Sequence, residues 1–316
     1  MKVLVTGADG FVGGWLTRSL LEAGHFVTGV HRNGGHPSPI LSPQEQSRVA
    51  WREMELRDGG SVVTALAGES DAVVHLAAVA SGADARRDPG LAWEVNAAGS
   101  ARLAEALGSM VGDGHAGPIL LFVSTSEVYG QGTGALRQEQ DALLPCSPYA
   151  ASKAGAEVAV LEVARRTGLR VIVARPFQHI GPGQDTRFVV PALVQRLRAA
   201  KRTGDATIQT GNLDVIRDIL DVRDVAAAYL ALLERGTAGE TYNVATGTGY
   251  ALAAVLERLQ RMLGSRVKAA LDPQLARRSD IRHLVGDASK LRSATGWAAR
   301  FTLDQTLQDL CDAQTD

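Results

Sequence analysis

The sequence predicts an α/β fold in which a doubly wound parallel sheet is joined to a smaller C-terminal domain. Through the first half of the chain, short runs of valine, leucine and isoleucine alternate with segments of helical periodicity. Such alternation implies crossover connections and a parallel sheet. The near-continuous apolar runs are typical of strands that helices cover on both faces. After Arg175 this rhythm stops, which indicates a second folding unit.

The elements of the first half follow from these patterns. Strands are expected at residues 3–5, 26–30, 49–56, 72–76, 119–123 and 170–174. Helices are expected where apolar residues recur at three- and four-residue spacing, at residues 11–23, 61–66, 91–107 and 148–167. Residues 33–47 contain two glycines and three prolines, so we expect a surface loop there.

The second half predicts further helices at residues 188–200 and 251–263, with a glycine-proline turn at residues 181–183 before them. Residues 221–235 also have helical spacing, and we expect this segment to return to the first domain. We therefore divide the chain into residues 1–175, with a return segment near 218–245, and residues 176–316, which mainly form the smaller domain.

Composition argues against several classes of function. The formal net charge is -1, whereas nucleic-acid binding usually needs a basic surface. The two cysteines, Cys146 and Cys311, lack the spacing of a metal site and suit a reducing compartment. The chain opens with a strand pattern and not a signal peptide, and no apolar stretch is long enough to span a bilayer. We expect a cytoplasmic protein with no metal, no nucleic-acid partner and no membrane association.

A glycine-rich turn, Thr6-Gly7-Ala8-Asp9-Gly10-Phe11-Val12-Gly13, directly follows the first expected strand. Gly7 permits a tight turn, Gly10 lets the backbone approach a pyrophosphate, and Gly13 lets the helix pack closely on the strand. The helix N-terminus then stabilises the negative charge. The placement between a strand and a helix favours a dinucleotide site over a purely structural turn.

The end of the second strand indicates which dinucleotide binds. An acidic residue there would pair with the ribose 2′-hydroxyl of NAD, but the chain has His31-Arg32-Asn33. The guanidinium of Arg32 suits a 2′-phosphate. The sequence therefore favours NADP(H), with NAD as the alternative, unless Arg32 is only a solvated loop residue.

A tyrosine and a lysine stand four residues apart at the start of a long expected helix. This spacing places Tyr149 and Lys153 on one helix face. A nearby ammonium favours the phenolate, so Tyr149 becomes a usable proton donor and acceptor. A hydroxyl from Ser124 or Thr125, at the end of the fifth strand, could hydrogen-bond a substrate oxygen. Glu127 is either a further acid or base, or a carboxylate that caps a helix or is solvated.

Together with His75-Leu76-Ala77-Ala78, these motifs resemble the extended short-chain dehydrogenase/reductase family, also called the epimerase/dehydratase family. The resemblance runs nearly end to end. It implies a Rossmann sheet that binds the dinucleotide, a C-terminal domain that binds the substrate, and a homodimer. It assigns catalysis to Thr125, Glu127, Tyr149 and Lys153. It assigns cofactor binding to Gly7, Gly10, Phe11, Val12, Arg32, Glu55, Leu56, Leu76, Ala77, Ala78, Asn96, Ser124, Tyr149, Lys153 and Pro176.

The second half resembles bacterial GDP-4-keto-6-deoxy-D-mannose reductases, which make GDP-D-rhamnose. The similar segments are residues 175–184, 211–214, 217–224, 242–244 and 295–297. This resemblance implies a GDP-linked sugar substrate, bound by Gln178, Val189, Asn212, Arg217 and Arg277. The family usually has asparagine where this chain has Gln178, so the departure bears on which sugar or base is bound.

The expected reaction is reduction of the 4-keto group of a GDP-4-keto-6-deoxy-hexose by NADPH. A nucleotide-sugar 4,6-dehydratase is the nearest alternative, because Ser124-Thr125-Ser126-Glu127 resembles its catalytic segment. A 4-epimerase is a third reading. A non-catalytic NADP(H) sensor with the same fold is a fourth, although this chain retains the hydroxyl, the tyrosine and the lysine.

Overall fold

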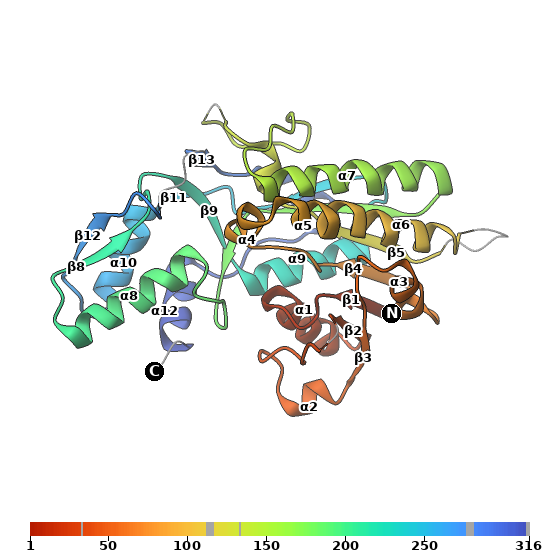
Figure 1. Ribbon diagram of the computed structural model, residues 1–316, viewed down its shortest axis with the longest axis horizontal. Helices are drawn as coiled ribbons and strands as arrows, with labels where there is room; N and C mark the ends of the chain where they lie inside the picture. The colour runs from red at the N-terminus through yellow and green to blue at the C-terminus, as the bar shows by residue number, and fades with distance from the viewer. Residues whose placement is uncertain (33, 112–116, 133, 276–280, 314–316) are drawn as a thin grey trace.

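The structure is a computed structural model that describes residues 1–32, 34–111, 117–132, 134–275 and 281–313. Within these residues seven parallel strands form one sheet in the order β3-β2-β1-β4-β5-β6-β10 (Figure 1). The strands are β1 (Lys2–Thr6), β2 (Phe26–His31), β3 (Val49–Glu53), β4 (Ala72–His75), β5 (Ile119–Val123), β6 (Val171–Pro176) and β10 (Thr241–Val244). The order reverses between β1 and β4, the point at which doubly wound sheets bind ligands. The predicted α/β fold class is confirmed.

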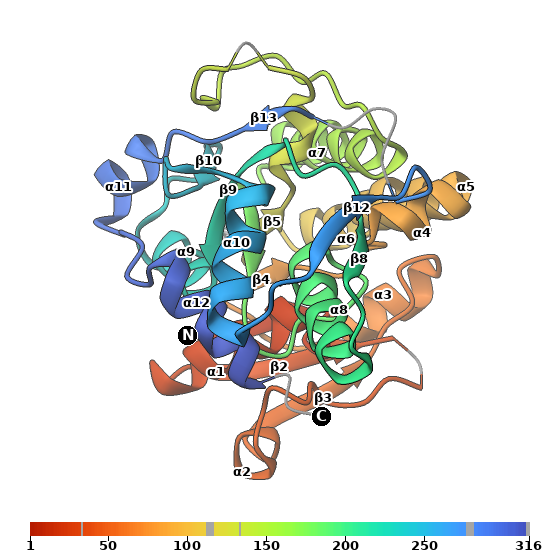
Figure 2. The same ribbon diagram turned by 90° about the vertical axis from the view of Figure 1, so that its left-hand side faces the viewer.

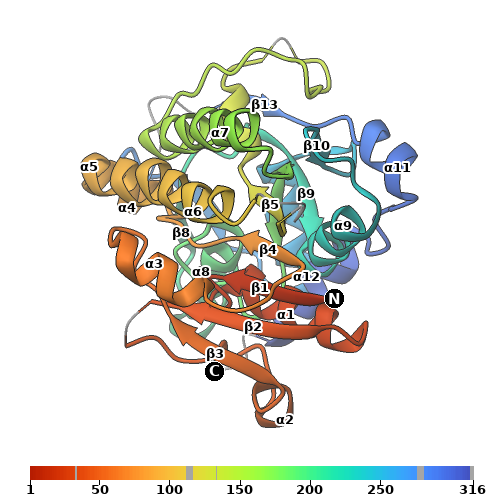
Figure 3. The same ribbon diagram turned by 90° about the vertical axis from the view of Figure 1, so that its right-hand side faces the viewer.

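Helices cover both faces of this sheet, as Figure 3 shows. The helices α1 (Phe11–Glu22) and α9 (Val222–Arg235) pack on one face, and α3 (Gly59–Leu66), α6 (Gly99–Gly108) and α7 (Pro148–Thr167) on the other. Side chains alternate between the faces, so Val3 and Val5 join the core under α1 while Leu4 joins the core under α6 and α7. This two-sided burial explains the continuous apolar runs of the strands.

A smaller region with its own apolar core lies at one end of the sheet, on the left of Figure 1 and facing the viewer in Figure 2. Its helices are α8 (Val189–Thr203), α10 (Leu252–Leu263) and α12 (Leu303–Ala313), beside the parallel strands β8 (Thr207–Thr210) and β12 (Lys268–Leu271). Strand β9 (Ile216–Asp221) pairs with β7 (Gln178–Ile180), β11 (Gly249–Ala251) and β13 (His283–Leu284).

The chain re-enters the first region after β9. Helix α9 packs against α1, and β10 pairs with β6 at the edge of the large sheet. The exact division of the chain into two domains stays a prediction. Among the described residues, no helix has both the length and the apolar character needed to cross a membrane.

Local structure departs from the sequence expectations in several places. The helix expected at residues 91–107 is interrupted: α5 (Pro89–Trp93) passes through a π-helical turn, Glu94–Ala98, into α6. The third strand ends at Glu53 and not at residue 56. The loop at residues 33–47 contains the short helix α2 (Pro43–Gln46), which a capping box between Ser42 and Glu45 starts. Sequence periodicity also missed α4 (Gly82–Arg87), α11 (Ser289–Thr295), α12 and a 3₁₀ turn at Ser126–Tyr129.

Candidate active site

The turn between β1 and α1 has the shape that a phosphate site requires. Gly7 has a φ of +70°, which L side chains rarely adopt. A Cβ on Gly13 would overlap the Gly7 carbonyl and lie 2.7 Å from the Cα of Ala8, so only glycine lets α1 begin this close to β1. Among the described residues no side chain caps α1. Its first N–H groups are therefore available to an anion.

A cleft of about 1360 Å³ extends along the carboxyl edge of the sheet and onto the smaller region. The structure brings most of the predicted site residues together there. The predicted residues that line it are Gly7, Gly10, Phe11, Val12, Arg32, Glu55, Leu56, Leu76, Ala77, Ala78, Ser124, Thr125, Glu127, Tyr149, Lys153, Pro176, Gln178, Val189, Asn212 and Arg217. Asn96 is buried and does not line the cleft. Arg277 lies outside the described residues. The individual roles of these residues stay predictions.

One end of the cleft carries two arginines and one glutamate. Glu55, just after β3, is bound by the Arg57 guanidinium at 3.0 and 3.1 Å. These hydrogen bonds, with the charge of Arg32 adding a smaller effect, lower the pKa of Glu55. The three side chains leave one net positive charge at this end, which suits a phosphate group. Sequence reasoning missed Arg57, although it follows the third strand much as Arg32 follows the second.

A buried chain of hydrogen bonds begins at the loop after β4. The N–H groups of Leu76 and Ala77 donate to the Thr6 hydroxyl oxygen at 3.2 and 3.1 Å. With both lone pairs used, that hydroxyl donates its own proton to Nδ1 of His75, 2.7 Å away. Nε2 of His75 then carries the ring proton and donates to Ser100 at 3.0 Å. Burial and the Lys153 charge lower the pKa of His75 to about 3, so the ring is neutral and this direction is fixed at neutral pH.

The chain continues through Asn96 to the catalytic helix. The Ser100 hydroxyl donates to the Asn96 carbonyl in the π-helical turn. The Asn96 side chain accepts from the N–H of Val79 at 2.7 Å, and it donates to the Val79 carbonyl and to the Ser152 hydroxyl. Ser152 donates to the carbonyl of Tyr149 at 2.8 Å. Asn96 thus positions the loop after β4 against the first turn of α7 instead of lining the cleft itself.

Tyr149 lies in the first turn of α7, which Ser147 caps and Pro148 begins. Burial of the phenol raises the pKa of Tyr149, and the charge of Glu127 adds to the rise, while a hydrogen bond with Thr125 opposes it. Tyr149 is therefore protonated at neutral pH. The Thr125 hydroxyl hydrogen-bonds this phenol, and Glu127, in the 3₁₀ turn after β5, lines the same cleft.

Lys153 lies one turn further along α7 and is 2% exposed. Its ammonium sits 4.5 Å from the centre of the Phe122 ring. Burial lowers the pKa of Lys153 to about 8, although the negative charge of Glu157 raises it. Lys153 is therefore mostly charged at neutral pH, and a small rise in pH above neutral begins to deprotonate it.

A buried ion pair supports this part of the helix. Glu157 accepts two hydrogen bonds from Arg175, at 3.0 and 2.7 Å, and a third from the Ser124 hydroxyl. Arg175 also donates to the Tyr129 hydroxyl at 3.0 Å, and Tyr129 donates to Asn243 at 2.7 Å. The Ser124 hydroxyl is therefore engaged by Glu157, although Ser124 also lines the cleft. Of the two hydroxyls considered from sequence, Thr125 is the one that faces Tyr149.

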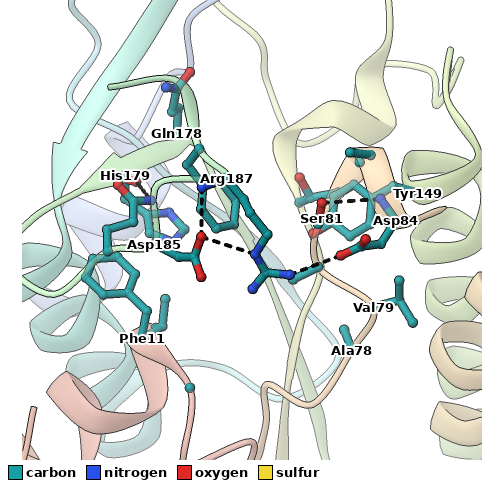
Figure 4. Close-up of a pocket in the computed structure, with 18 of the residues that line it drawn as sticks. Phe11, Ala78, Val79, Ser81, Asp84, Tyr149, Gln178, His179, Asp185 and Arg187 are labelled. Atoms are coloured by element: carbon teal, nitrogen blue, oxygen red, sulfur yellow. Dashed lines mark hydrogen bonds and ion pairs between the residues drawn. The ribbon is translucent and has the colours of Figure 1, made fainter. Parts of the chain in front are cut away.

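The opposite wall belongs to the smaller region. Figure 4 shows Gln178 and His179 on one side of the cleft and Tyr149 on the other. The His179 ring stacks on Phe11, with centroids 6.5 Å apart, and its Nδ1 contacts the carbonyl of Phe177. The Arg217 guanidinium donates to backbone carbonyls of Ile216 and Ile281 at 2.9 and 2.6 Å, which holds it in this wall.

An ion pair joins the two walls (Figure 4). Arg187, in the segment between β7 and α8, lies 3.1 Å from Asp84 of α4 and 3.1 Å from Asp185. Sequence reasoning missed these residues, because 103 positions separate Asp84 from Arg187 and only the fold brings them together. The described part of the chain contains no cluster of His, Cys, Asp and Glu side chains suited to a metal ion.

Breaking the bridge between Asp84 and Arg187 should speed the release of a nucleotide from the cleft. Because Arg187 is 60% exposed, the pair is worth at most about 1 kcal/mol, and we expect Arg187→Gln to raise the NADPH dissociation rate by no more than about fivefold at low salt. Stopped-flow fluorescence measures this rate. Arg87→Gln is the matched control, since Arg87 pairs with the same Asp84 at 3.0 Å but does not line the cleft.

A charge swap tests whether the pair itself is responsible. Arg187→Asp alone should release NADPH faster than Arg187→Gln, because it sets three carboxylates together, and adding Asp84→Arg should restore slow release. If the double variant releases NADPH as fast as the single one, the bridge does not hold the cleft closed.

Comparison with known proteins places this geometry in a family. The family model described as GDP-mannose 4,6 dehydratase matches residues 4–310. The chain is 34% identical to a GDP-6-deoxy-D-mannose reductase of Pseudomonas aeruginosa, over 97% of this chain and 95% of that protein. It is 30% identical to a GDP-6-deoxy-D-talose 4-dehydrogenase of Aggregatibacter actinomycetemcomitans, over 96% of this chain and 94% of that protein.

A solved structure shows the same fold. The structure of RMD from Pseudomonas aeruginosa complexed with NADPH superposes with a TM-score of 0.80 at 32% identity, and the match covers 99% of this chain and 98% of that one. The match to the family model and the identity to these relatives extend over nearly the whole chain. The chain therefore belongs to the GDP-mannose 4,6-dehydratase family of epimerases, dehydratases and reductases.

Proposed function

We propose that this protein reduces the 4-keto group of a GDP-4-keto-6-deoxy-hexose with NADPH and so forms a GDP-6-deoxyhexose such as GDP-D-rhamnose. One observation carries the proposal: Tyr149, Lys153 and Thr125 lie in the same cleft as the glycine turn between β1 and α1. The name of the Pseudomonas aeruginosa relative, GDP-6-deoxy-D-mannose reductase, supports the choice of substrate.

NADPH is the proposed reductant, with NAD(H) as the alternative. The uncapped N-terminus of α1 fits a pyrophosphate, and the net positive charge of Arg32, Arg57 and Glu55 fits a 2′-phosphate. The relative of known structure was solved with NADPH.

The side chains around Tyr149 suit proton transfer to a reduced carbonyl. When bound, the dihydronicotinamide supplies the hydride that adds to C4 of the sugar, and the carbonyl electron pair moves to the oxygen. Tyr149 donates its proton to that oxygen, and the Thr125 hydroxyl hydrogen-bonds it. The Lys153 ammonium then stabilises the phenolate that remains. A tyrosine that burial keeps protonated begins this cycle in the required state.

Incubation of the enzyme with the GDP-4-keto-6-deoxy-hexose and NADPH should consume both, with loss of absorbance at the NADPH band. Tyr149→Phe removes the proton donor, so kcat should fall by about 10² to 10⁴ while NADPH still binds. Binding is followed by titration of NADPH fluorescence. A folded wild-type enzyme that oxidises no NADPH with this substrate contradicts the proposal.

A 4,6-dehydratase acting on GDP-mannose is the second candidate, because Glu127 lines the same cleft as Tyr149 and could act as the acid or base that eliminates water. Such an enzyme regenerates its own cofactor. Turnover of GDP-mannose without added NADPH would therefore establish the dehydratase, and its absence, with NADPH-dependent turnover of the ketosugar, establishes the reductase. A 4-epimerase would instead interconvert the C4 epimers of a GDP-hexose.

The pH dependence should report Lys153. Its ammonium is charged below its pKa of about 8, so kcat/KM should fall as the pH rises through that value. Glu157→Gln removes the negative charge that raises this pKa, and the basic limb should move to lower pH. Glu157→Asp keeps the charge and should leave the limb in place. An unmoved limb in a folded Glu157→Gln enzyme would assign it to another group.

We also propose a homodimer through the helices at residues 91–107 and 148–167. Leu91, Trp93 and Val158 are 36%, 46% and 65% exposed on α5 and α7, and the Trp93 ring lies over Gly155 of α7. Light scattering should give twice the 33.3 kDa chain mass. Val158→Glu should yield monomers, whereas Val63→Glu, at an equally apolar exposed site on α3, should not. A dimer that tolerates Val158→Glu would contradict this interface.

The proposed compartment is the cytoplasm. Both Cys146 and Cys311 are free, as is usual where thiols are kept reduced. Nucleotide-sugar substrates and NADPH are also made inside the cell, which suits the proposed reaction.

A further inference from the structure

The cleft continues past the catalytic side chains into the smaller region, along helix α8. The N-terminal end of α8 lies in the same part of the cleft as Tyr149, because Arg187, just before this helix, reaches Asp84 at 3.1 Å (Figure 4). From there α8 extends away from the large sheet toward β8 (Figure 1). Val189 and Arg196 both line the cleft from this helix. They are about two turns apart, which places Arg196 about 10 Å further along α8.

The far end of the cleft is built where β8 ends. The Arg196 guanidinium donates to the carbonyl of Gln209 on β8 at 2.8 Å. The carbonyl of the next residue, Thr210, accepts from the N–H of Asp272 at 2.9 Å, where a turn at residues 272–275 follows β12. Arg196 and Leu275, which both line the cleft, are thus held beside neighbouring positions of β8.

Two apolar side chains remain exposed in this part of the cleft. Val189 is 38% exposed and Leu275 is 40% exposed, and both line the cleft. They come from different elements, α8 and the turn after β12. Exposed apolar side chains inside a cleft, with a few polar groups near them, are typical of a site for a small ligand. Here they suit the flat faces of an aromatic ring.

Arg196 adds hydrogen-bond donors, and no acceptor, to this apolar surface. A guanidinium carries five N–H groups in a planar fork. One of them donates to Gln209, and the others have no hydrogen-bond partner among the described residues. Arg196 is also the only charged side chain among the described cleft residues in 189–196, 211–215, 252 and 274–275. A ring bound here therefore meets a fixed pattern of donors at its edge.

We propose that Arg196 recognises the base of the nucleotide sugar as guanine, by donating two parallel hydrogen bonds to O6 and N7 while Val189 and Leu275 contact the faces of the ring. This inference rests on the proposed function, in which the sugar lies at Tyr149 and the base points to the far end of the cleft. Guanine presents two adjacent acceptors, which match the fork of an arginine. Adenine presents a donor beside N7, and uracil has a C–H group beside O4.

Calorimetric titration with GDP, 7-deaza-GDP and UDP tests the assignment. 7-Deaza-GDP keeps O6 but has a C–H group in place of N7. The wild type should bind GDP most tightly of the three. Arg196→Met keeps a long apolar side chain and removes the donors, so GDP affinity should fall about five- to hundredfold, as for loss of a bidentate contact to a base. GDP and 7-deaza-GDP should then bind alike, and UDP should be weakened less than GDP.

Arg202→Met is the matched control. It removes the same charge from the last turn of α8, at an exposed residue that does not line the cleft, so all three affinities should stay unchanged. Arg196→Lys separates recognition of the base from attraction of the diphosphate. A lysine keeps the charge but not the planar fork, so this variant should also lose the preference for GDP over 7-deaza-GDP.

Three results would overturn the inference: equal weakening of all three nucleotides by Arg196→Met, full rescue by Arg196→Lys, or tighter binding of UDP than GDP by the wild type. Unchanged NADPH affinity shows that each variant is folded. Because the titrations measure binding alone, they are independent of the reaction. A protein that shows the expected guanine preference but oxidises no NADPH with the GDP-linked ketosugar would contradict the proposed function and still support the role of Arg196.

Discussion

Keeping an ammonium charged in a buried site is the constraint on which the rest of this active site depends. Burial drives Lys153 toward its neutral form, and Glu157, one turn along α7, opposes that effect. Glu157 is itself buried, and a buried carboxylate is tolerated only when its oxygens are paired. Arg175 from β6 and Ser124 from the end of β5 supply those partners. The Lys153 charge therefore requires a set of buried polar groups, and their hydrogen bonds connect β5 and β6 to α7.

A second set of polar contacts ties the cofactor side to the same helix. The chain through Thr6, His75 and Ser100 reaches Asn96, whose side chain holds Val79 on one side and Ser152 on the other. Because the His75 ring is neutral, these groups donate in one direction along the chain. The π-helical turn at Glu94–Ala98 belongs to this arrangement, since π-turns often occur where a side chain must reach a functional site. These hydrogen bonds thus hold the loop after β4 in a fixed position relative to the first turn of α7.

The sequence predicted what depends on local pattern. The glycine turn and the Tyr149/Lys153 spacing are each visible in a few neighbouring residues, and both lie in the cleft. The sheet class follows from the alternation of short apolar runs with helical segments. Sequence periodicity could not show the break in the helix at residues 91–107, because the Asn96 side chain in that turn is held by Val79 and Ser152, which lie outside the segment. The same holds for the Asp84–Arg187 bridge. Such contacts join residues that are distant in the sequence, so only the folded structure shows them.

The protonation state of Tyr149 bears on the choice between reduction and dehydration. A reductase starts from the neutral phenol, whereas a dehydratase first oxidises C4 and so begins with tyrosine as a base. In this protein, burial and the charge of Glu127 both favour the neutral phenol. Glu127 thereby favours the state of Tyr149 from which a reductase begins. A glutamate that resembles an elimination catalyst in sequence can therefore contribute to a simple reduction, through its charge and without transferring a proton.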